Sequence, residues 1–554
     1  MSSPNLTPRA ASRLEPVWAF IAKRPSLACL VLGLASACGY PPLHLWWLAL
    51  FALAAFLALL YEAPSWRAAA WRGWLFGWAH LTLANNWIAT AFTHQAKMPE
   101  FLGWIAVPLL CVYLAVYPAL AALTAHALYQ RFKAPTSGFL AFSGVFAATW
   151  VVFEWTRSWA FTGYPWPPLS LVLLGGWDTP GAAWFLPWMG TYGLSGLFVI
   201  LAGGVASGLR RQRPLEWVGL LVALTLTMHA MPTPASRPSD VAFTLVQPLL
   251  KQDEINDGSK FEEQFVRIAE LTATGRGSSR VVLWPESAIP DYLEDGYPQR
   301  FYDRMTALNP ATGRGDPAFA RQRIGSVIGA DSTLLTGVVN LDMGVVDGRR
   351  QPVSARNSVV ALNGAGELTH HYAKAHLVPY GEYLPMRPIL EPLGLSRLVA
   401  GSIDYLAGPG PRTLDLGKHG KAGVQICYEI VFSGRVVDPD ARPDYLFNPS
   451  NDGWFGAWGP PQHLGQARMR ALEEGLPVLR STTTGISAVI DANGVVLQHI
   501  PSGVADAVEG MVPAAHEPTP FSRFGNALPL ALAALVFMLS LIGPRLLALR
   551  PARG

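Results

Sequence analysis

Apolar residues fill long uninterrupted stretches in the first 235 positions of the chain and return near its end. A helix needs about 20 mainly apolar residues to cross a hydrocarbon core about 30 Å thick. The pattern therefore predicts an α-helical bundle of about eight membrane-spanning helices, seven before a long polar segment and one after it. Their expected ranges are roughly 26–42, 44–62, 71–93, 101–129, 137–158, 181–207, 215–233 and 526–548.

The first two ranges are short, and Tyr40-Pro41-Pro42 lies between them. They are compatible with a helical hairpin or with one interrupted helix. A cleavable signal peptide is a further interpretation of the N-terminus. It is disfavoured, because apolar stretches continue after the first one and no clean cleavage site follows it.

Basic residues occupy every second loop between these ranges. Cytoplasmic loops carry an excess of Lys and Arg, so the alternation predicts that both termini are cytoplasmic. By parity, the polar segment from about 234 to 525 then faces the opposite, periplasmic side. The basic residues are Arg9, Arg13, Lys23 and Arg24 before the first span, Arg67 and Arg72, Arg131 and Lys133, Arg210, Arg211 and Arg213, and Arg545, Arg550 and Arg553 after the last.

The polar segment contains short apolar runs that alternate with amphipathic stretches, which predicts a layered α/β domain with helices outside. The expected organisation is 1–233 with seven spans, 234–525 as the folded domain, and 526–554 with the last span and a tail. Strand-like runs are Val241–Val246, Arg280–Trp284, Leu334–Val339, Ser358–Leu362, Val424–Cys427, Tyr445–Phe447, Val478–Arg480 and Ala488–Ile490, and helix-like stretches include Phe261–Leu271 and His463–Glu474.

Composition strengthens the membrane interpretation and excludes one class of partner. Hydrophobic residues make up 51% of the chain and charged residues 14%, against about 25% charged in a soluble domain. The 20 Trp residues agree with this, because Trp favours the boundary between lipid and water. The net charge of +4 is small and no long basic run is present, so nucleic acid is not an expected partner.

Cysteine usage draws attention to one thiol. Cys29, Cys38 and Cys111 fall within expected spans, where they can pack as small apolar residues. Cys427 is the single cysteine of the polar segment. An unpaired thiol in an oxidising compartment is either buried and inert or chemically employed.

Three apolar runs end near residues that can take part in acyl transfer, namely Glu286, Lys374 and Cys427. Ends of neighbouring strands converge at the edge of an α/β sheet, where such folds place reactive groups. A thiol can attack an ester carbonyl and hold the acyl group as a thioester. A carboxylate can take and return the proton, and a Lys with the backbone N–H after Cys427 can stabilise the oxyanion. A structural ion pair beside an inert thiol stays open as the alternative.

The segments around these residues resemble the nitrilase (carbon–nitrogen hydrolase) superfamily. Several longer motifs resemble, more narrowly, the apolipoprotein N-acyltransferase family, and the resemblance covers nearly the whole chain. These motifs are Lys374–Pro385, Asn448–Gly456, Gln462–Leu464 and Ala467–Ala471 in the polar segment, and Glu154–Arg157 and Phe161–Trp166 among the spans.

The resemblance implies a nitrilase-like αββα sandwich and an enzyme of a bacterial inner membrane that needs no cofactor. The implied reaction moves a fatty acyl chain from a phospholipid of the phosphatidylethanolamine type to the α-amino group of the diacylglyceryl-modified N-terminal Cys of an apolipoprotein, which completes lipoprotein maturation. Ping-pong kinetics through a thioester follow from serial use of one site. The implied site residues are Glu286 as base, Lys374 as oxyanion group, Cys427 as nucleophile, and Glu382, Tyr428 and Glu429 as supporting residues.

The chain departs from the family pattern at two places. A Trp usually follows shortly after the Val-Gln that opens the domain, whereas here Val246-Gln247 is followed by 253–256 without a Trp. A segment that often reads Thr-Asn-Thr-Gly is here Thr482-Thr483-Thr484-Gly485. Neither departure touches Glu286, Lys374 or Cys427.

Two further pairs are candidates for lipid contact. Trp454 and Phe455 lie on a Gly-rich loop and are either core aromatics or the lining of a lipid portal. Glu154 and Arg157 lie near a membrane boundary, where charge is a functional candidate by default. They form either a simple interfacial pair or a contact with a lipid headgroup.

Three histidines, His370, His371 and His376, raise the question of a metal site. Adjacent residues on a strand point to opposite faces, and no Cys or carboxylate at ligand spacing accompanies these histidines. The sequence therefore predicts no metal.

Two other functions stay open. A membrane-tethered amidase or nitrilase would share the Glu, Lys and Cys and would hydrolyse small amides. A transporter or binding protein with a degenerate domain would be inert towards esters and amides, and the intact set of three residues argues against it.

Overall fold

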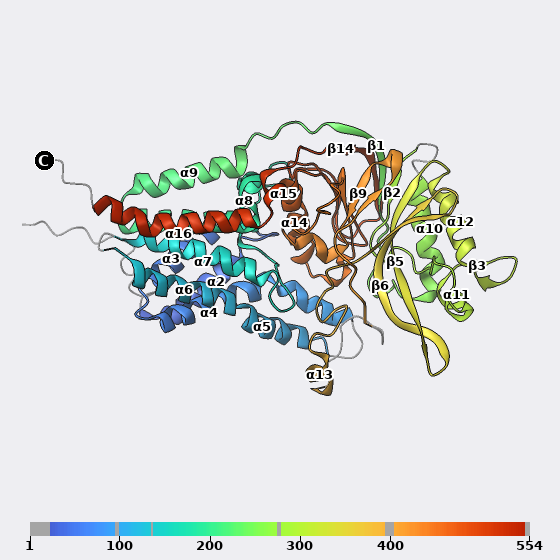
Figure 1. Ribbon diagram of the computed structural model, residues 1–554, viewed down its shortest axis with the longest axis horizontal. Coiled ribbons are helices and arrows are strands. Elements are labelled where there is room, and N and C mark those ends of the chain that lie inside the picture. Colours follow the sequence, from blue (N-terminus) through green and yellow to red (C-terminus); the bar gives the residue numbers. More distant parts are fainter. Residues whose placement is uncertain (1–22, 95–98, 135–136, 274–278, 394–403, 549–554) are drawn as a thin grey trace, which may run out of the picture.

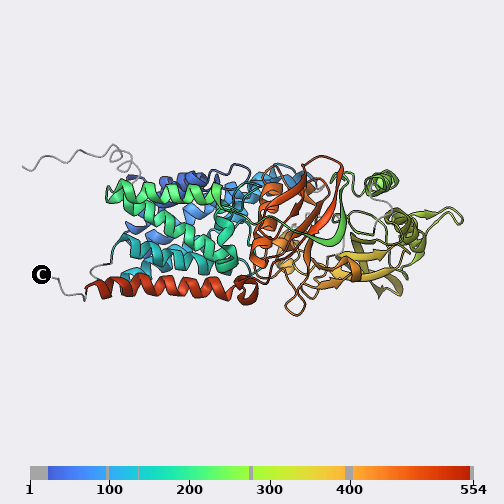
Figure 2. The ribbon, with the colours of Figure 1, turned by 90° about the horizontal axis from the view of Figure 1, so that it is seen from above.

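The computed structural model describes residues 23–548 except 95–98, 135–136, 274–278 and 394–403. The molecule is elongated, with a helical bundle at one end and two β-sheets at the other (Figure 1). The helix α16, which follows the sheets in sequence, runs back along the bundle in both views (Figures 1 and 2). Arg9, Arg13, Arg550 and Arg553 lie outside the described residues, as does most of the segment to which a signal peptide would belong.

The bundle is built from apolar helices. Among the described residues, three stretches are long and apolar enough to cross a membrane, namely Leu102–Phe132, Phe139–Arg157 and Ala182–Arg210. Shorter apolar helices accompany them, so the number of eight spans stays a prediction. The helices are α2 (Pro25–Ala37), α3 (Trp46–Tyr61), α4 (Trp66–Ala84), the 3₁₀-helix η1 (Asn86–His94), α5 (Leu102–Leu114), α6 (Val116–Phe132), α7 (Phe139–Arg157), α8 (Leu186–Arg210), α9 (Pro214–Ala230) and α16 (Ala527–Ala548).

The first two expected spans are two separate helices. α2 and α3 pack against each other, and the core residues Cys29, Ala37, Ala49 and Leu53 belong to one cluster. Packing of this kind requires the chain to fold back between them. The arrangement is therefore a hairpin and not one interrupted helix.

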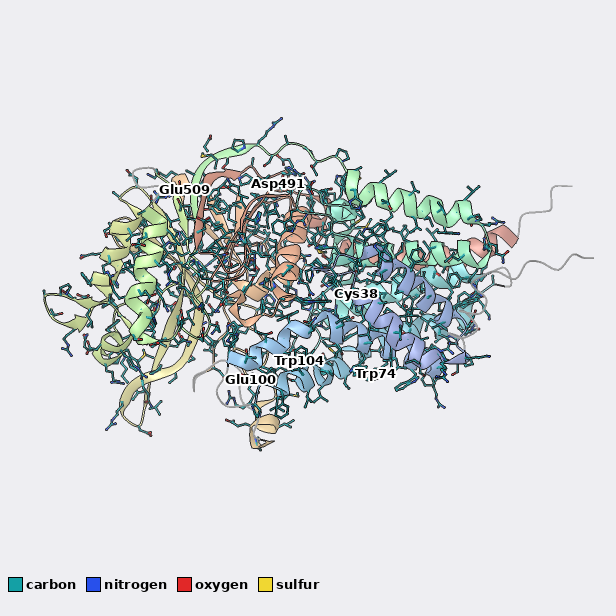
Figure 3. The ribbon with its side chains drawn as sticks, turned by 180° about the vertical axis from the view of Figure 1, so that it is seen from behind. Cys38, Trp74, Glu100, Trp104, Asp491 and Glu509 are labelled. Carbon is teal, nitrogen blue, oxygen red and sulfur yellow. The ribbon has the colours of Figure 1, made fainter. Side chains whose placement is uncertain are left out.

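The outside of the bundle is apolar. Phe101, Trp104 and Leu109 on and beside α5 are 61%, 69% and 64% exposed. Trp74 and Trp104 lie on the same side of the bundle in Figure 3. Exposed apolar side chains in this number mark a surface that contacts lipid or another apolar partner.

Two six-stranded sheets form the other half of the molecule, in the orders β14-β1-β2-β5-β6-β7 and β13-β12-β11-β10-β9-β8. The pairs β1–β2, β2–β5, β9–β10 and β10–β11 are parallel. The first sheet contains β1 (Pro238–Gln247), β2 (Val281–Leu283), β5 (Thr333–Val346), β6 (Arg349–Asn363), β7 (Leu368–Ala373) and β14 (Asp506–Pro513), and the second contains β8 (Thr413–Asp415), β9 (Lys421–Val424), β10 (Tyr445–Ser450), β11 (Val478–Thr482), β12 (Ser487–Ile490) and β13 (Val496–Ile500).

The sheets pack face to face, because residues of both, such as Leu283 and Phe447, share one buried cluster. α10 (Phe261–Thr272) and α12 (Pro317–Ile328) cover the outer face of the first sheet. α14 (Gly459–Glu474) covers the outer face of the second sheet and lies between that sheet and the bundle (Figure 1). The expected helix–sheet–sheet–helix layering is confirmed.

Four strands of the two large sheets, β7, β8, β13 and β14, were not among the expected runs. Four of the five residues of β13 and six of the eight residues of β14 are exposed or half-buried, and β8 has three residues. Edge strands of this kind lack the continuous apolar run that indicates a buried strand. For the same reason β5 and β6 extend beyond their expected ends as a long, partly exposed hairpin.

Candidate active site

The structure brings the three predicted residues together, but from two sheets. Glu286 follows β2 and Lys374 follows β7, both in the first sheet, whereas Cys427 follows β9 in the second. The expectation that neighbouring strand ends of one sheet would converge is therefore corrected. The site forms where two sheets packed face to face bring their strand ends together.

Glu286 is held by main-chain and side-chain donors. Its Oε2 accepts a hydrogen bond from the Asn451 N–H (2.8 Å), and its Oε1 accepts one from Asn357 Nδ2 (2.7 Å). Gly337 of β5 passes directly beneath it, since a Cβ at Gly337 would lie 2.6 Å from the Glu286 Cα. A glycine is thus required there for the carboxylate to reach the site.

Lys374 is a buried ammonium between two carboxylates and is 2% exposed. Its Nζ lies 3.0 Å from Glu382 Oε1 and 3.6 Å from Glu286 Oε1. Burial alone would lower the pKa of Lys374, but the charges of Glu382 and Glu286 raise it above its ordinary value. The side chain is therefore charged and fixed in place.

Asn357 of β6 joins the two carboxylates, since its Nδ2 also donates to Glu382 Oε1 (2.9 Å). Glu382 Oε2 accepts in turn from the Val378 N–H (2.7 Å). No motif or spacing marked Asn357, which lies between Arg356 and Ser358 within β6. It shares the positioning of these carboxylates with Glu382, which the family resemblance had named as a supporting residue.

Cys427 was expected to end a strand, but β9 ends at Val424 and Cys427 is the first residue of the 3₁₀-helix η8 (Cys427–Val431). Its φ of +49° is in the left-handed region, which a residue with a Cβ seldom adopts outside functional sites. Burial and the charge of Glu286 raise the pKa of the thiol well above its ordinary value, while Lys374 and the Asn451 N–H oppose this. The resting thiol is protonated, so nucleophilic attack needs a base.

Glu429 joins the loop after β7 to the loop after β9. Its Oε1 accepts from Tyr372 Oη (2.8 Å), the Ala375 N–H (2.7 Å) and the His376 N–H (3.2 Å), and its Oε2 accepts from the Ile426 N–H (2.8 Å). Burial raises the pKa of Glu429 to about 7, although these donors lower it. The carboxyl group links the Lys374 and Cys427 segments.

Tyr428 links the thiol loop to the bundle. Its hydroxyl lies 3.4 Å from the Gly163 carbonyl oxygen, which follows α7. Its ring packs edge-on against Phe432 (5.2 Å). The side chain next to the thiol therefore contacts a segment that the family motif 161–166 marks.

A buried polar network lies behind the thiol loop. His463 Nε2 lies 3.0 Å from the Cys427 carbonyl oxygen, and its Nδ1 lies 3.0 Å from Asp452 Oδ1. Arg480 pairs with Asp452 at 2.7 Å. The family motifs contain Asp452 and His463, but the sequence assigned a role to neither of them or to Arg480.

Trp454 and Phe455 lie on a loop that packs against η1. The Phe455 ring is 4.5 Å from that of Trp87 and 5.7 Å from that of Trp166, and Trp454 lies edge-on to His94 at 6.0 Å. Both side chains are partly exposed. These contacts join the loop to the bundle, and a lipid portal at this place stays a prediction.

Glu154 and Arg157 are both buried at the end of α7. Arg157 donates to the carbonyl oxygens of Trp166 (3.2 Å) and Pro167 (3.0 Å), and Glu154 Oε1 accepts from the Leu169 N–H (2.7 Å). The pair orders the segment after α7. Contact with a lipid headgroup stays a prediction that these partners do not require.

The three histidines do not converge. His371 contacts Asn340 Oδ1 at 3.1 Å, and His376 stacks on Phe432 at 4.2 Å. Burial lowers the pKa of His376 to about 4. Within the described part of the chain, no group of three His, Cys, Asp or Glu side chains is placed to hold a metal ion.

Comparison with known proteins identifies both halves. Residues 32–204 match the family model of the apolipoprotein N-acyltransferase N-terminal domain, and residues 252–506 match that of carbon–nitrogen hydrolases. The apolipoprotein N-acyltransferase of Caulobacter vibrioides is 32% identical over 534 residues, which is 92% of each chain. The chain belongs to the apolipoprotein N-acyltransferase family. That of Rhodopseudomonas palustris is 31% identical over 499 residues, or 86% of each chain.

Membership of the apolipoprotein N-acyltransferase family makes this chain an acyltransferase with a nitrilase-like C-terminal half. The resemblance inferred from the motifs is thus confirmed. A solved amidase from Nesterenkonia sp. AN1, with an acetamide moiety added at its active-site cysteine, covers 54% of this chain and 96% of its own at 14% identity and a TM-score of 0.33.

The two departures from the apolipoprotein N-acyltransferase pattern meet at Asn451. Asn451 Nδ2 donates to Gln252 Oε1 (2.8 Å), directly before the 253–256 segment that lacks the Trp. Thr483 Oγ1 donates to Asn451 Oδ1 (2.8 Å), in the Thr-Thr-Thr-Gly segment. Both altered segments therefore support the residue whose N–H binds Glu286.

Proposed function

We propose that this member of the family transfers a fatty acyl chain from a phospholipid of the phosphatidylethanolamine type to the α-amino group of a diacylglyceryl-modified N-terminal Cys of an apolipoprotein. This is the last step of lipoprotein maturation, and it runs through a thioester on Cys427. The carrying observation is the buried cluster in which Lys374 lies between Glu286 and Glu382 and acts electrostatically on the thiol.

Acylation begins with the protonated thiol. Glu286 takes the proton as Cys427 Sγ bonds to the ester carbonyl carbon, and the carbonyl π electrons become an oxyanion. The Lys374 ammonium and a backbone N–H after the nucleophile stabilise that charge. The oxyanion collapses, the C–O ester bond breaks, and the lysophospholipid leaves with the proton from Glu286.

Deacylation uses the same groups in a second round. The neutral α-amine of the apolipoprotein attacks the thioester carbon and Glu286 takes the amine proton. The C–S bond then breaks to give the amide, and Glu286 returns the proton to Cys427 Sγ, which restores the thiol. Burial of Cys427, which is 6% exposed, shields the thioester from water until the amine arrives. This shielding favours transfer over hydrolysis.

The same proposal places both termini in the cytoplasm and the sheets in the periplasm of a bacterial inner membrane. Basic residues gather at the end of the bundle far from the sheets: Arg545 donates to the Phe132 carbonyl (2.8 Å), and Arg210 pairs with Glu62 (2.7 Å). α9 leads directly into β1, so the loop before it lies at that far end (Figure 1). A basic end supports a cytoplasmic assignment.

Reporter fusions test the orientation. A reporter that works only in the cytoplasm gives a signal when fused after Arg213 and none when fused after Asp240. The opposite pattern would overturn the topology.

The chemistry is tested by mass spectrometry of the purified full chain after incubation with phospholipid alone. We expect one fatty acyl mass on Cys427 that neutral hydroxylamine removes, because thioesters yield to it faster than oxyesters or amides. Cys427→Ala abolishes the adduct and transfer, and Cys427→Ser loses most activity because a hydroxyl is harder to deprotonate. Cys38→Ala, whose thiol contacts the Leu34 carbonyl of α2, is the matched control.

An adduct that forms equally on Cys427→Ala protein would contradict the proposed mechanism. Hydrolysis of a water-soluble amide in detergent, without any phospholipid adduct, would identify a membrane-tethered amidase instead.

A further inference from the structure

One histidine, His463, binds the main-chain carbonyl of the proposed nucleophile Cys427. His463 is fully buried on α14, and its Nε2 lies 3.0 Å from the Cys427 carbonyl oxygen. The side-chain amide of Asn448 approaches the same oxygen at 3.5 Å. Because the acceptor is a carbonyl, His463 Nε2 must carry the proton.

Two buried charges hold the other side of the ring. His463 Nδ1 lies 3.0 Å from Asp452 Oδ1 and 3.0 Å from an Arg480 guanidinium nitrogen, and Arg480 pairs with Asp452. Burial and the Arg480 charge lower the pKa of His463. Asp452 and Arg480 both contact Nδ1, so the orientation of the ring is set by side chains that are themselves fully buried.

The hydrogen bond from His463 to the Cys427 carbonyl also orients the N–H of the next residue, Tyr428. The Cys427 C=O and the Tyr428 N–H belong to one planar peptide and point in opposite directions. Tyr428 is in the first turn of η8, where N–H groups have no carbonyl partner within the helix. Holding the carbonyl on one side therefore aims this N–H on the other.

We propose that His463 is a positioning residue for the oxyanion: by binding the Cys427 carbonyl, it directs the Tyr428 N–H at the charge that develops on the substrate. The inference deepens the proposed function and rests on it, because it takes Cys427 as the nucleophile. It also explains how Cys427 keeps a φ of +49°, since strained backbone persists when its surroundings over-determine it.

Helix α14, which carries His463, is itself hydrogen-bonded to the helical bundle. Gln462, next to His463, accepts from Trp166 Nε1 (2.8 Å) and donates to the Ala84 carbonyl (3.1 Å). One turn later Arg468 donates to the Gly175 carbonyl (3.0 Å). The helix that aims the N–H is thus bound to the part of the molecule that meets the bilayer.

Two amide substitutions separate the two ring nitrogens. The Nε2 of Gln can occupy the place of His463 Nε2 and donate to the carbonyl, whereas the amide of Asn reaches only the place of Nδ1. His463→Gln should acylate Cys427 from phospholipid within about 10-fold of the wild-type rate. His463→Asn should lose about 100-fold, the lower figure for loss of one oxyanion donor.

Alkylation of Cys427 by iodoacetamide distinguishes the two roles. If His463 were merely structural, its substitution would slow alkylation as well as acylation. Displacement at a saturated carbon needs the thiol in place but forms no oxyanion. We expect equal alkylation rates in wild type, His463→Gln and His463→Asn, with acylation lost in the Asn variant alone.

Equal acylation by the two variants would overturn the proposal, and so would parallel losses of alkylation and acylation in His463→Asn. Failure of the proposed function is read separately, in the wild type. Alkylation of Cys427 without any phospholipid adduct there would overturn the acyl transfer, and the oxyanion role with it.

Discussion

The two sides of the site are built by different means. On the first sheet, Glu286, Lys374, Glu382 and Asn357 hold one another through side-chain contacts of 2.7–3.6 Å. On the second sheet, a neutral thiol is held through its main chain by His463. The charge cluster tolerates small shifts of the backbone but no change of charge. The Cys427–Tyr428 peptide, which His463 holds by a hydrogen bond, depends instead on the exact position of that bond.

The two sides also differ in their attachment to the bundle. α14 fastens the second sheet to α8 and to the 169–185 segment. The outer face of the first sheet is covered by α10 and α12, away from the bundle (Figure 1). The thiol is thus positioned relative to the bundle, and the charged side chains reach it from the opposite sheet.

Changing the shape of the charge on the first sheet should have the largest effect. Lys374→Arg keeps the charge, but a guanidinium is broader than an ammonium and cannot fit between Glu286 and Glu382 unchanged. We expect kcat to fall about 100- to 1000-fold, nearly as far as in Lys374→Ala. Single-turnover acylation measures this.

Lys418→Arg is the matched control, because the exposed ion pair of Lys418 with Asp331 does not restrict the shape of the cationic group. Near-normal turnover by Lys374→Arg would mean that this lysine is structural.

Short-range pattern predicted much of this molecule. Apolar runs located most helices and the buried strands, and motif wording located Glu286, Lys374 and Cys427. The roles of Asn357 and His463 were not predicted, because their partners Glu286 and Cys427 lie 71 and 36 residues away in sequence. Such pairs exist only once two sheets and a helix have packed, and no local period records them.

The attachment of the second sheet is tested at Arg468. Its fully buried guanidinium donates to the carbonyls of Gly175, Gly176, Thr179 and Gly494. Arg468→Lys keeps the charge but cannot reach all four oxygens, so buried acceptors are left unpaired. We expect a loss of about 2–3 kcal/mol in denaturant-induced unfolding in detergent.

Arg323→Lys, whose partner Glu262 is exposed on the first-sheet side, should cost under about 0.5 kcal/mol. Similar losses in both variants would erase the contrast between the two sheets.

Removing one carboxylate from the charge cluster should have an intermediate effect. Glu382→Gln keeps an oxygen for Lys374 but places an amide against the Val378 N–H. Because Glu382 raises the pKa of Lys374, that pKa falls and the alkaline limb of the kcat profile moves to lower pH. We expect about a 10-fold loss at neutral pH, which corresponds to the lower end, about 1.5 kcal/mol, of the range for a hydrogen bond to a charged group.

Glu391→Gln, an exposed carboxylate beside Arg387, should leave the profile unchanged. A loss of rate without any shift of the alkaline limb would contradict the electrostatic explanation.

The smallest expected effect concerns the bond that joins the two sides, from Tyr372 on β7 to Glu429 beside the thiol (2.8 Å). The hydroxyl lowers the pKa of Glu429, which burial has raised to about 7, so it stabilises the ionised carboxylate. Its contribution is therefore full above that pKa and declines as pH falls through it. Tyr372→Phe should cost about 1.5 kcal/mol of unfolding free energy at pH 8 and only a small part of that at pH 6, where the carboxyl group is mostly protonated. Tyr445→Phe is the control, because its buried hydroxyl donates to the neutral His419 carbonyl (3.1 Å) and its cost should not change with pH. Equal pH dependence in both variants would show that Glu429 does not titrate near 7, and that the two sides are joined by a bond that pH leaves untouched.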